Sequence, residues 1–214
     1  EPSGSRAVLS AVSRESFFTM ADVQRRKTRL RSDLRQRRNS LNSAQQDTAA
    51  QALIHSVVTL PNWASAQRIA LYLATDGEID TRALENTARG LAKEIFLPLI
   101  TDRRLCFAQW HEQALLSSNR YNIAEPPADA VRYPASDLDI IFLPTVGWDG
   151  HGGRLGMGGG FYDRTLSGIS GPLLVGLAHE NQHVDEIPLE KWDIALDYVA
   201  TDVGLHRCQK DSRY

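Results

Sequence analysis

The residues best suited to chemistry lie in a glycine-rich stretch over residues 147–164. More than half of the chain's 15 glycines fall in it. Arg154 lies inside the stretch, and Asp163 directly follows its last glycines. Backbone N–H groups that carry no side chain can surround a phosphate, and an arginine and a carboxylate nearby suit a nucleotide with its metal ion. We therefore expect phosphate binding here, and a connector without chemistry is the alternative.

The spacing of the glycines excludes two common phosphate loops. The stretch contains no lysine, which a P-loop requires before Ser or Thr. Counting from Gly156 or from Gly158, the sixth position is not glycine, so the dinucleotide fingerprint is absent. The remaining pattern is an apolar strand over 140–143, a loop and a helix from Phe161, which predicts that the N–H groups of residues 157–161 bind an anion.

A strongly basic helix is predicted over residues 24–38. Leu30 and Leu34 form its narrow apolar stripe. Lys27 and Arg31 are four residues apart and flank this stripe, so both can reach a cleft, while the other basic side chains are expected in solvent. Such a cluster could also bind nucleic acid, but the net charge of -2 argues against that alternative.

Apolar, strand-like runs alternate with helical segments along the rest of the chain. A helix is expected to begin near Ser43, where Ser43 and Gln46 would form a capping box, with Leu53, Ile54, Val57 and Val58 on its core face. The further expected strands are 68–73, 94–100 ending at Pro98, 105–110, 138–143, 173–178 and 198–201, with helices over 81–91 and from 161.

Continuous apolar strands that alternate with helices are typical of a parallel sheet covered on both faces. We predict a single three-layer α/β/α domain with a mostly parallel mixed sheet over residues 21–214. A poorly specified extension over residues 1–20 precedes it. The functional site is expected at the carboxyl ends of the strands.

The bulk properties are those of a globular domain. The chain has 214 residues, 42% of them hydrophobic and 23% charged. Its two cysteines are isolated, which favours a reducing compartment, and no apolar run approaches the roughly 20 residues of a membrane span. We expect a cytoplasmic protein without a membrane or nucleic-acid partner, acting as a monomer.

The segment His179–His183 matches the His-Glu-x-x-His pattern of zinc proteases. That chemistry needs both histidines on one helical face. The pattern follows a strand directly, and Pro188 leaves room for little helix. We therefore expect a loop at the end of a strand rather than a zinc site.

The run from Arg154 to Asp163, Arg-Leu-Gly-Met-Gly-Gly-Gly-Phe-Tyr-Asp, resembles the loop of the 5-formyltetrahydrofolate cyclo-ligase family, Arg-Leu-Gly-x-Gly-x-Gly-Tyr-Tyr-Asp. Phe161 departs from the more usual tyrosine of that pattern. The resemblance extends from about Lys27 to Thr201. Its further anchors are Lys27-x-x-Leu30-Arg31, the basic pair Arg37-Arg38, Glu78 after the first strand, Gln182 and Asp193.

The resemblance implies an ATP- and Mg²⁺-dependent ligase that converts 5-formyltetrahydrofolate into 5,10-methenyltetrahydrofolate through a phosphorylated formyl group. It places Lys27 and Arg154 in catalysis and Gln182 on the folate side of the cleft. ATP would be bound by Lys27, Arg31, Arg154, Leu155, Gly156, Met157, Gly158, Gly159, Gly160, Phe161 and Tyr162. The folate would contact Leu73, Glu78, Met157, Gly158, Gly159, Gly160 and Phe161. Asp163 and Asp193 would hold Mg²⁺.

Each of these carboxylates also has a structural interpretation. Asp163 could be a favourable charge at a helix start, Asp193 a turn or cap residue, and Glu78 an acid in a first helical turn. A nucleotide- or nucleic-acid-binding regulator on the same scaffold remains the alternative to an enzyme, because fold alone does not determine function.

Overall fold

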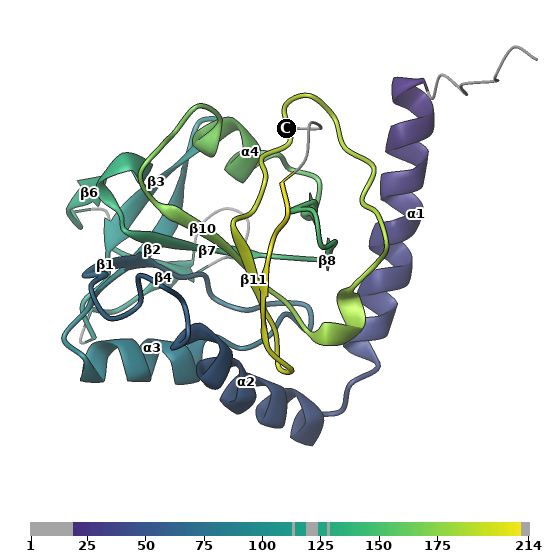
Figure 1. Ribbon diagram of the computed structural model, residues 1–214. Coiled ribbons are helices and arrows are strands. Elements are labelled where there is room, and N and C mark those ends of the chain that lie inside the picture. Colours follow the sequence, from purple (N-terminus) through teal and green to yellow (C-terminus); the bar gives the residue numbers. More distant parts are fainter. Residues whose placement is uncertain (1–18, 113, 119–123, 128, 211–214) are drawn as a thin grey trace, which may run out of the picture.

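The computed structural model describes residues 19–210 except 113, 119–123 and 128. An eight-stranded sheet runs through it in the order β12–β11–β10–β7–β1–β2–β3–β6 (Figure 1). These strands are β1 Arg68–Ala70, β2 Glu94–Thr101, β3 Arg104–Gln109, β6 Arg132–Tyr133, β7 Ile140–Pro144, β10 Leu173–Leu177, β11 Tyr198–Ala200 and β12 Leu205–Arg207. Two small ribbons pair β4 Ser117–Ser118 with β5 Ala124–Glu125, and β8 Gly147–Trp148 with β9 Arg154–Leu155.

The sheet is mixed and mostly parallel, which confirms the predicted fold class. Strands β11, β10, β7, β1 and β2 are parallel neighbours, whereas β3, β6 and β12 add antiparallel edges. The edge strands β6 and β12 were not predicted, because strands of two and three residues are too short to show a hydrophobic pattern.

The central strand β7 is apolar on both faces. Ile140 and Phe142 belong to one hydrophobic core, and Ile141 and Leu143 belong to the other. Successive side chains of a strand point to opposite faces, so a continuous apolar run is what a doubly covered sheet requires.

Helices α2 (Ser43–Val57) and α3 (Arg82–Gly90) cover one face of the sheet (Figure 1). The other face is covered by the short helix α4 (Phe161–Leu166), the 3₁₀ turn η1 (Ala135–Asp137) and loops. The capping box of α2 is formed by Asn42 and Gln45, one residue before the predicted pair. Of its predicted core face, Leu53 and Val57 are buried, whereas Val58 is exposed.

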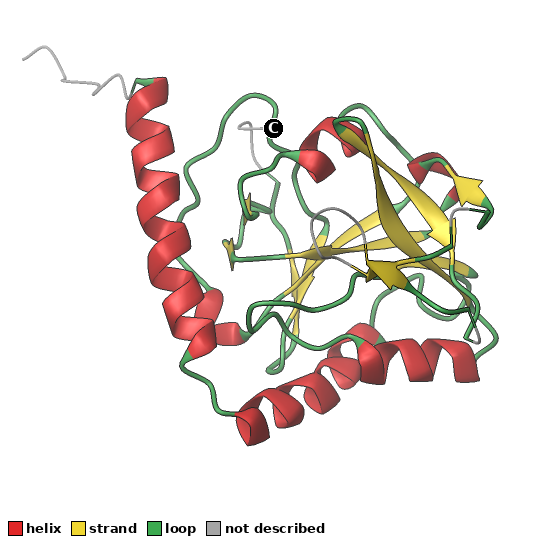
Figure 2. Cartoon of the chain, turned by 180° about the vertical axis from the view of Figure 1, so that it is seen from behind, coloured by secondary structure: helices red, strands yellow, loops and turns green. Residues whose placement is uncertain are grey.

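Helix α1 (Met20–Asn39) stands at one end of the sheet and leans on β8 and the 3₁₀ turn η2 (Glu180–Gln182) (Figures 1 and 2). It begins earlier than predicted, because Thr19 and Asp22 form a capping box. The predicted extension therefore loses its last residues to this helix, and residues 1–18 lie outside the described part of the chain.

Strand β2 passes through Pro98, where the prediction ended it. Its pairing with β1 stops at Phe96, whereas its pairing with β3 continues from Phe96 to Thr101. Pro98 therefore lies where β2 has a neighbour on one side only, and a missing N–H is tolerated there.

Within the described ranges, no helix is long and apolar enough to cross a membrane.

The glycine-rich stretch divides into two parts with different roles. Residues 147–155 form the β8–β9 ribbon, whose turn is built around the fully buried Asp149. The Asp149 carboxylate accepts hydrogen bonds from the N–H groups of His151, Gly153 and Ile187 at 2.8–2.9 Å. Residues 156–160 lie between this ribbon and α4, and they are called the glycine loop below.

Candidate active site

A cleft of about 670 Å³ opens at the carboxyl ends of β1, β2 and β7. It brings together every residue to which the resemblance gave a role in catalysis or in binding ATP, folate or metal. These are Lys27, Arg31, Leu73, Glu78, Arg154, Leu155, Gly156, Met157, Gly158, Gly159, Gly160, Phe161, Tyr162, Asp163 and Asp193. Their meeting in one cleft is a structural finding, and their individual roles stay predictions.

Helix α1 brings Lys27 to the polar end of the cleft. The Lys27 side chain is buried, and its ammonium lies 2.5 Å from Asp193 Oδ2 and 3.0 Å from Glu190 Oε2. Burying an ammonium is costly without such partners. Asp193 Oδ2 also accepts a hydrogen bond from the backbone N–H of Glu190 at 2.8 Å, which fixes the carboxylate on its loop. Glu190 was not predicted to belong to the site, although its position three residues before Asp193 in the sequence could have indicated it.

Arg31, one helical turn after Lys27, joins α1 to the glycine loop. Its Nε donates a hydrogen bond to the carbonyl oxygen of Gly156 at 2.8 Å. Burial lowers the pKa of Arg31, and the charges of Asp193 and Glu190 oppose that shift. The guanidinium stays protonated, so it holds positive charge beside the loop.

The glycine loop has a conformation that only glycine adopts readily. Gly158 and Gly160 have φ values of 99° and 64°, in the left-handed region. Gly156 has another reason, because a Cβ there would lie 2.8 Å from Arg154 Nη1. Among the residues that the structure describes, none accepts a hydrogen bond from the N–H groups of residues 157–160. The loop can therefore offer these donors to an anion.

Arg154 lies beneath the loop, and its side chain is only 4% exposed. Its Nη1 donates to the carbonyl oxygen of Pro144 at 3.1 Å, and its Nη2 lies 3.4 Å from Asp163 Oδ2. The guanidinium also stacks over the ring of Tyr162, 5.5 Å from the centroid. Its Nε is buried and has no hydrogen-bond partner among the described residues. A partly unsatisfied, buried arginine is suited to an anionic ligand.

Two carboxylates approach the same polar end from different segments. Asp163 is in the first turn of α4 and also accepts from the N–H of Ile194 at 3.3 Å, next to Asp193 in the sequence. Within the described residues, no group of three or more His, Cys, Asp or Glu side chains is placed to hold a metal ion. Mg²⁺ in nucleotide sites usually takes one or two protein carboxylates together with phosphates and water. The donor set therefore fits a metal ion that binds with a nucleotide.

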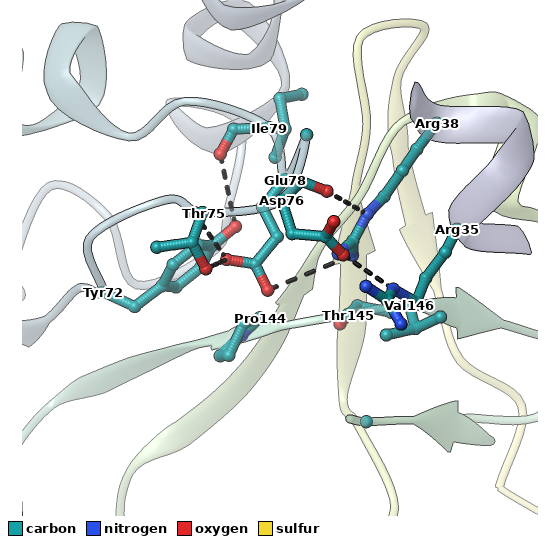
Figure 3. A network of polar contacts seen from close by, with 12 residues as sticks. Arg35, Arg38, Tyr72, Thr75, Asp76, Glu78, Ile79, Pro144, Thr145 and Val146 are labelled. Carbon is teal, nitrogen blue, oxygen red and sulfur yellow. Dashed lines mark hydrogen bonds and ion pairs between the residues drawn. The ribbon is translucent and has the colours of Figure 1, made fainter. Parts of the chain in front are cut away.

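Apolar side chains also line the cleft, together with Glu78. Leu73, Leu97 and Phe161 are called the apolar wall below. Burial raises the pKa of Glu78, while a hydrogen bond from the N–H of Thr75, 3.0 Å long, and the charge of Arg38 oppose that shift (Figure 3). Tyr162 is half-buried in the lining of the cleft, and loss of solvation raises the pKa of its hydroxyl well above the usual value.

Two expectations from the sequence need correction, and one alternative interpretation, that of Glu78, is excluded. Gln182 does not line the cleft: it is fully buried, and its Nε2 donates to the carbonyl oxygens of Thr145 and Val146 at 2.8 Å. Arg38 was expected in solvent but is completely buried. Glu78 is not in a first helical turn, because α3 begins only at Arg82.

The histidine pair is placed as expected, at the end of a strand. His179 is buried, and its Nε2 lies 3.2 Å from the carbonyl oxygen of Gly77. His183 instead packs its ring against Trp148, with centroids 4.5 Å apart. The intervening 3₁₀ turn has only three residues, so the helical face that a zinc protease needs does not form.

Known proteins show the same combination of fold and motifs. The family model of 5-formyltetrahydrofolate cyclo-ligases matches residues 23–202. A 5-formyltetrahydrofolate cyclo-ligase of Escherichia coli strain K12 is 40% identical over 175 residues, covering 78% of this chain and 96% of the relative. The enzyme of that name from Haemophilus influenzae is 36% identical over 177 residues, covering 80% of this chain and 95% of the relative.

Solved structures agree with these sequence matches. The 5,10-methenyltetrahydrofolate synthetase of Aquifex aeolicus superposes with a TM-score of 0.75 at 30% identity, over 88% of this chain and 95% of that one. The synthetase of Mycoplasma pneumoniae, at 22% identity, supports the fold with a TM-score of 0.67 over 82% of this chain and 98% of that one. The prediction of an enzyme of the ligase class is confirmed, and the chain belongs to the 5-formyltetrahydrofolate cyclo-ligase family.

Proposed function

We propose that the chain uses ATP and Mg²⁺ to close 5-formyltetrahydrofolate to 5,10-methenyltetrahydrofolate, with release of ADP and phosphate. Membership of the family supports the cyclo-ligase reaction. One observation supports the use of ATP above all. The N–H groups of the glycine loop, which have no acceptor among the described residues, share a single cleft with the cations Lys27, Arg31 and Arg154.

The chemistry of the substrate explains why a phosphoryl donor is required. The oxygen of a formamide is a very poor leaving group. If this oxygen attacks the γ-phosphorus of ATP, ADP leaves and the formyl carbon carries a phosphate ester. The N10 atom then attacks that carbon, the C–O bond breaks, and the N10 proton leaves with the phosphate. The ring closes without a covalent bond to the enzyme.

The protein's task in such a transfer is to position the reactants and to balance charge. Arg154 is the strongest candidate for contact with the transferred phosphoryl group, because it is buried, charged and only partly hydrogen-bonded. Lys27 and Arg31 would hold the other phosphates beside the N–H groups of the loop. To reach a phosphate, Lys27 would have to share or exchange its present partners Glu190 and Asp193.

Asp163 and Asp193 are the candidates to hold Mg²⁺. Both are now paired with cations of the same cleft, Arg154 and Lys27. With a metal–nucleotide complex bound, Asp163 and Asp193 would hold the metal ion, and Lys27 and Arg154 would face the phosphates. Bound Mg²⁺ would supply positive charge that neutralises the phosphate oxygens during transfer.

The apolar wall with Glu78 suits the pterin ring of the folate. Phe161 and Leu73 offer flat and aliphatic surfaces to the ring. The pterin has two neighbouring N–H donors, at N3 and at the 2-amino group. The carboxylate of Glu78 can accept hydrogen bonds from both.

We also propose that the chain acts as a cytoplasmic monomer. All the residues assigned above belong to the cleft of a single chain, and both cysteines are free. Light scattering at assay concentration tests the monomer, which a dimer mass would contradict. Fluorescence microscopy of the tagged chain in cells tests the cytoplasmic location.

A spectroscopic assay tests the reaction. Methenyltetrahydrofolate absorbs in the near ultraviolet, where the formyl compound does not. Mixing the protein with 5-formyltetrahydrofolate, ATP and Mg²⁺ should produce this absorbance, and leaving out either ATP or Mg²⁺ should abolish it. No absorbance change with all components would favour a nucleotide-binding regulator without catalysis.

A further inference from the structure

Glu78 reaches the cleft from a tight turn over residues 75–78. Asp76 and Gly77 both lie in the left-handed region, with φ values of 51° and 74°. Asp-Gly is a favoured pair for two successive left-handed residues, as in a type I′ turn. The N–H of Glu78 donates to the carbonyl oxygen of Thr75 at 2.9 Å and closes the turn. The turn is therefore formed locally, and its place beside the cleft depends on support from outside the turn.

Arg38 of α1 provides that support (Figure 3). Its Nε donates to the carbonyl oxygen of Asp76 at 2.8 Å, and its Nη2 donates to Asp76 Oδ2 at 2.6 Å. Its Nη1 lies 4.0 Å from Glu78 Oε1 and has no hydrogen-bond partner among the described residues. The side chain is 0% exposed, and Arg38 does not line the cleft. Any effect of Arg38 on a bound molecule must therefore pass through the turn.

The charges around Glu78 make Arg38 its main cation. Asp76 contributes a negative charge from the same turn, and the hydroxyls of Tyr72, two residues after β1, and of Tyr162 in α4 interact with Glu78. Burial raises the pKa of Glu78, and among these neighbours only Arg38 lowers it by its charge. Without Arg38 the carboxyl would take up a proton at a higher pH.

We propose that Arg38 is a positioning residue for folate binding: it holds the turn over residues 75–78 in place and sets a positive charge beside the Glu78 carboxylate. The inference rests on the proposed function, in which Glu78 binds the pterin. An ionised carboxylate accepts both pterin N–H bonds, whereas a protonated one loses acceptor capacity. One face of α1 thus serves both ends of the cleft, since Lys27 and Arg38 are separated by about 16 Å along the helix axis.

Arg35 offers a matched control on the same helix. Its Nε donates to the same oxygen of Asp76, Oδ2, at 2.7 Å. Its side chain is 45% exposed, and Glu78 does not contribute to the shift that raises its pKa. Arg35→Met therefore removes one contact with the turn but keeps the cation near Glu78.

The test compares steady-state kinetics of Arg38→Met, Arg38→Lys and Arg35→Met across pH. Arg38→Met should raise the KM for 5-formyltetrahydrofolate about tenfold, the loss expected for one charged hydrogen bond. Its kcat and its KM for ATP should change less than about threefold, because the phosphate end is untouched. The acid limb of kcat/KM for the folate should move to higher pH, since Glu78 then protonates more readily.

The conservative and double variants separate positioning from general damage. Arg38→Lys keeps the charge without the planar fork, so its pH limb should stay close to the parent value while its KM is intermediate. In a Glu78→Gln background, Arg38→Met should no longer shift the pH limb. Arg35→Met should keep the parent pH profile.

Three results would overturn the inference: an unchanged pH limb in Arg38→Met, an equal loss in kcat and both KM values, or an Arg35→Met variant with the same shift. If Arg38→Met does not fold, Arg38→Lys in the parent and Glu78→Gln backgrounds decides the point through the KM. An unsubstituted protein that forms no methenyl product would refute the proposed function instead, so the two failures are distinguishable.

Discussion

Arg154 is the residue on which the account of phosphoryl transfer depends most. It is buried between Pro144, Asp163 and Tyr162, yet its Nε has no partner among the described residues. A preorganised cation of this kind stabilises charge that develops during transfer without having to reorient.

Arg154→Ala should reduce kcat by about 10²–10³-fold, the usual cost of removing one such donor. Arg154→Lys should recover only part of this, because an ammonium lacks the planar fork. The measurement is ATP-dependent formation of the methenyl product, with circular dichroism to confirm the fold. Full turnover by a folded Arg154→Ala would remove Arg154 from the catalytic role.

Asp163 is predicted to bind the metal, and its substitution should change the response to Mg²⁺. Asp163→Asn keeps the size and the hydrogen bond from Ile194 but removes a charge that Mg²⁺ prefers. The Mg²⁺ concentration for half-maximal rate should rise about tenfold or more, as a lost metal partner typically costs.

A matched control is Asp33→Asn, an exposed carboxylate on α1 whose side chain is 54% exposed. Its magnesium titration should match that of the parent. Coincident titrations for Asp163→Asn and the parent would leave Asp163 with the structural role of a charge near the start of α4.

At the scale of elements, the glycine loop packs closely against the side chain of Arg154. A methyl group at Gly156 would lie 2.8 Å from Arg154 Nη1, so Gly156→Ala must displace either the loop or the guanidinium. A displacement of about 1 Å at a reacting centre can cost up to about 10²-fold in rate. We expect kcat to fall by at least about tenfold in Gly156→Ala while the fold persists.

Gly150→Ala is the counterpart of this variant within the same glycine-rich stretch. Nothing lies within 4 Å of a Cβ at Gly150, and its φ is not in the left-handed region. It should retain the activity of the parent. Equal activity of both variants would show that Gly156 is not required by the packing of Arg154.

The turn over residues 75–78 links α1 to the cleft, and its contribution to the stability of the fold should depend on pH. Hydrogen bonds from Arg35, and then from Arg38, lower the pKa of Asp76 well below its usual range. The folded pKa is below the unfolded value, so the stabilisation is present above about pH 4 and disappears as the pH falls. Asp76→Asn should lower the free energy of unfolding by about 2 kcal/mol at pH 7, as for loss of a charged hydrogen bond.

Urea denaturation of Asp76→Asn and the parent between pH 7 and pH 2 measures this effect. The difference between the two proteins should narrow as the pH falls from about 4.5 toward 2. A difference that stays constant over this range would mean that the charge of Asp76 is not what stabilises the turn.

At the scale of the whole molecule, the long, buried elements were the predictable part. Strands β7 and β10 and helices α2 and α3 carry clear apolar patterns, because they are covered by a large core. The short edge strand β12 and the β8–β9 ribbon were missed. Their pairing depends on long-range partners, such as β11 for β12, that no local pattern encodes.

Most residues of the candidate site were predictable, although Glu190 was missed and Gln182 does not line the cleft, but the contacts between them were not. Motif spacing identified the residues of the loop, yet it could not show that Lys27 is held by both Glu190 and Asp193. Nor could the basic pattern of α1 separate the buried Arg38 from its exposed neighbours. Arg38 can be buried because the distant residue Asp76 offers it a carboxylate and a carbonyl oxygen.

The central claim is that this cleft activates the formyl oxygen by transferring a phosphoryl group to it, and an isotope experiment tests it most directly. The protein is given ATP, Mg²⁺ and 5-formyltetrahydrofolate labelled with ¹⁸O in the formyl group. The released phosphate is then examined by mass spectrometry. The account predicts one ¹⁸O atom in each phosphate released with the methenyl product. Product formation with unlabelled phosphate and ¹⁸O in the water would contradict it.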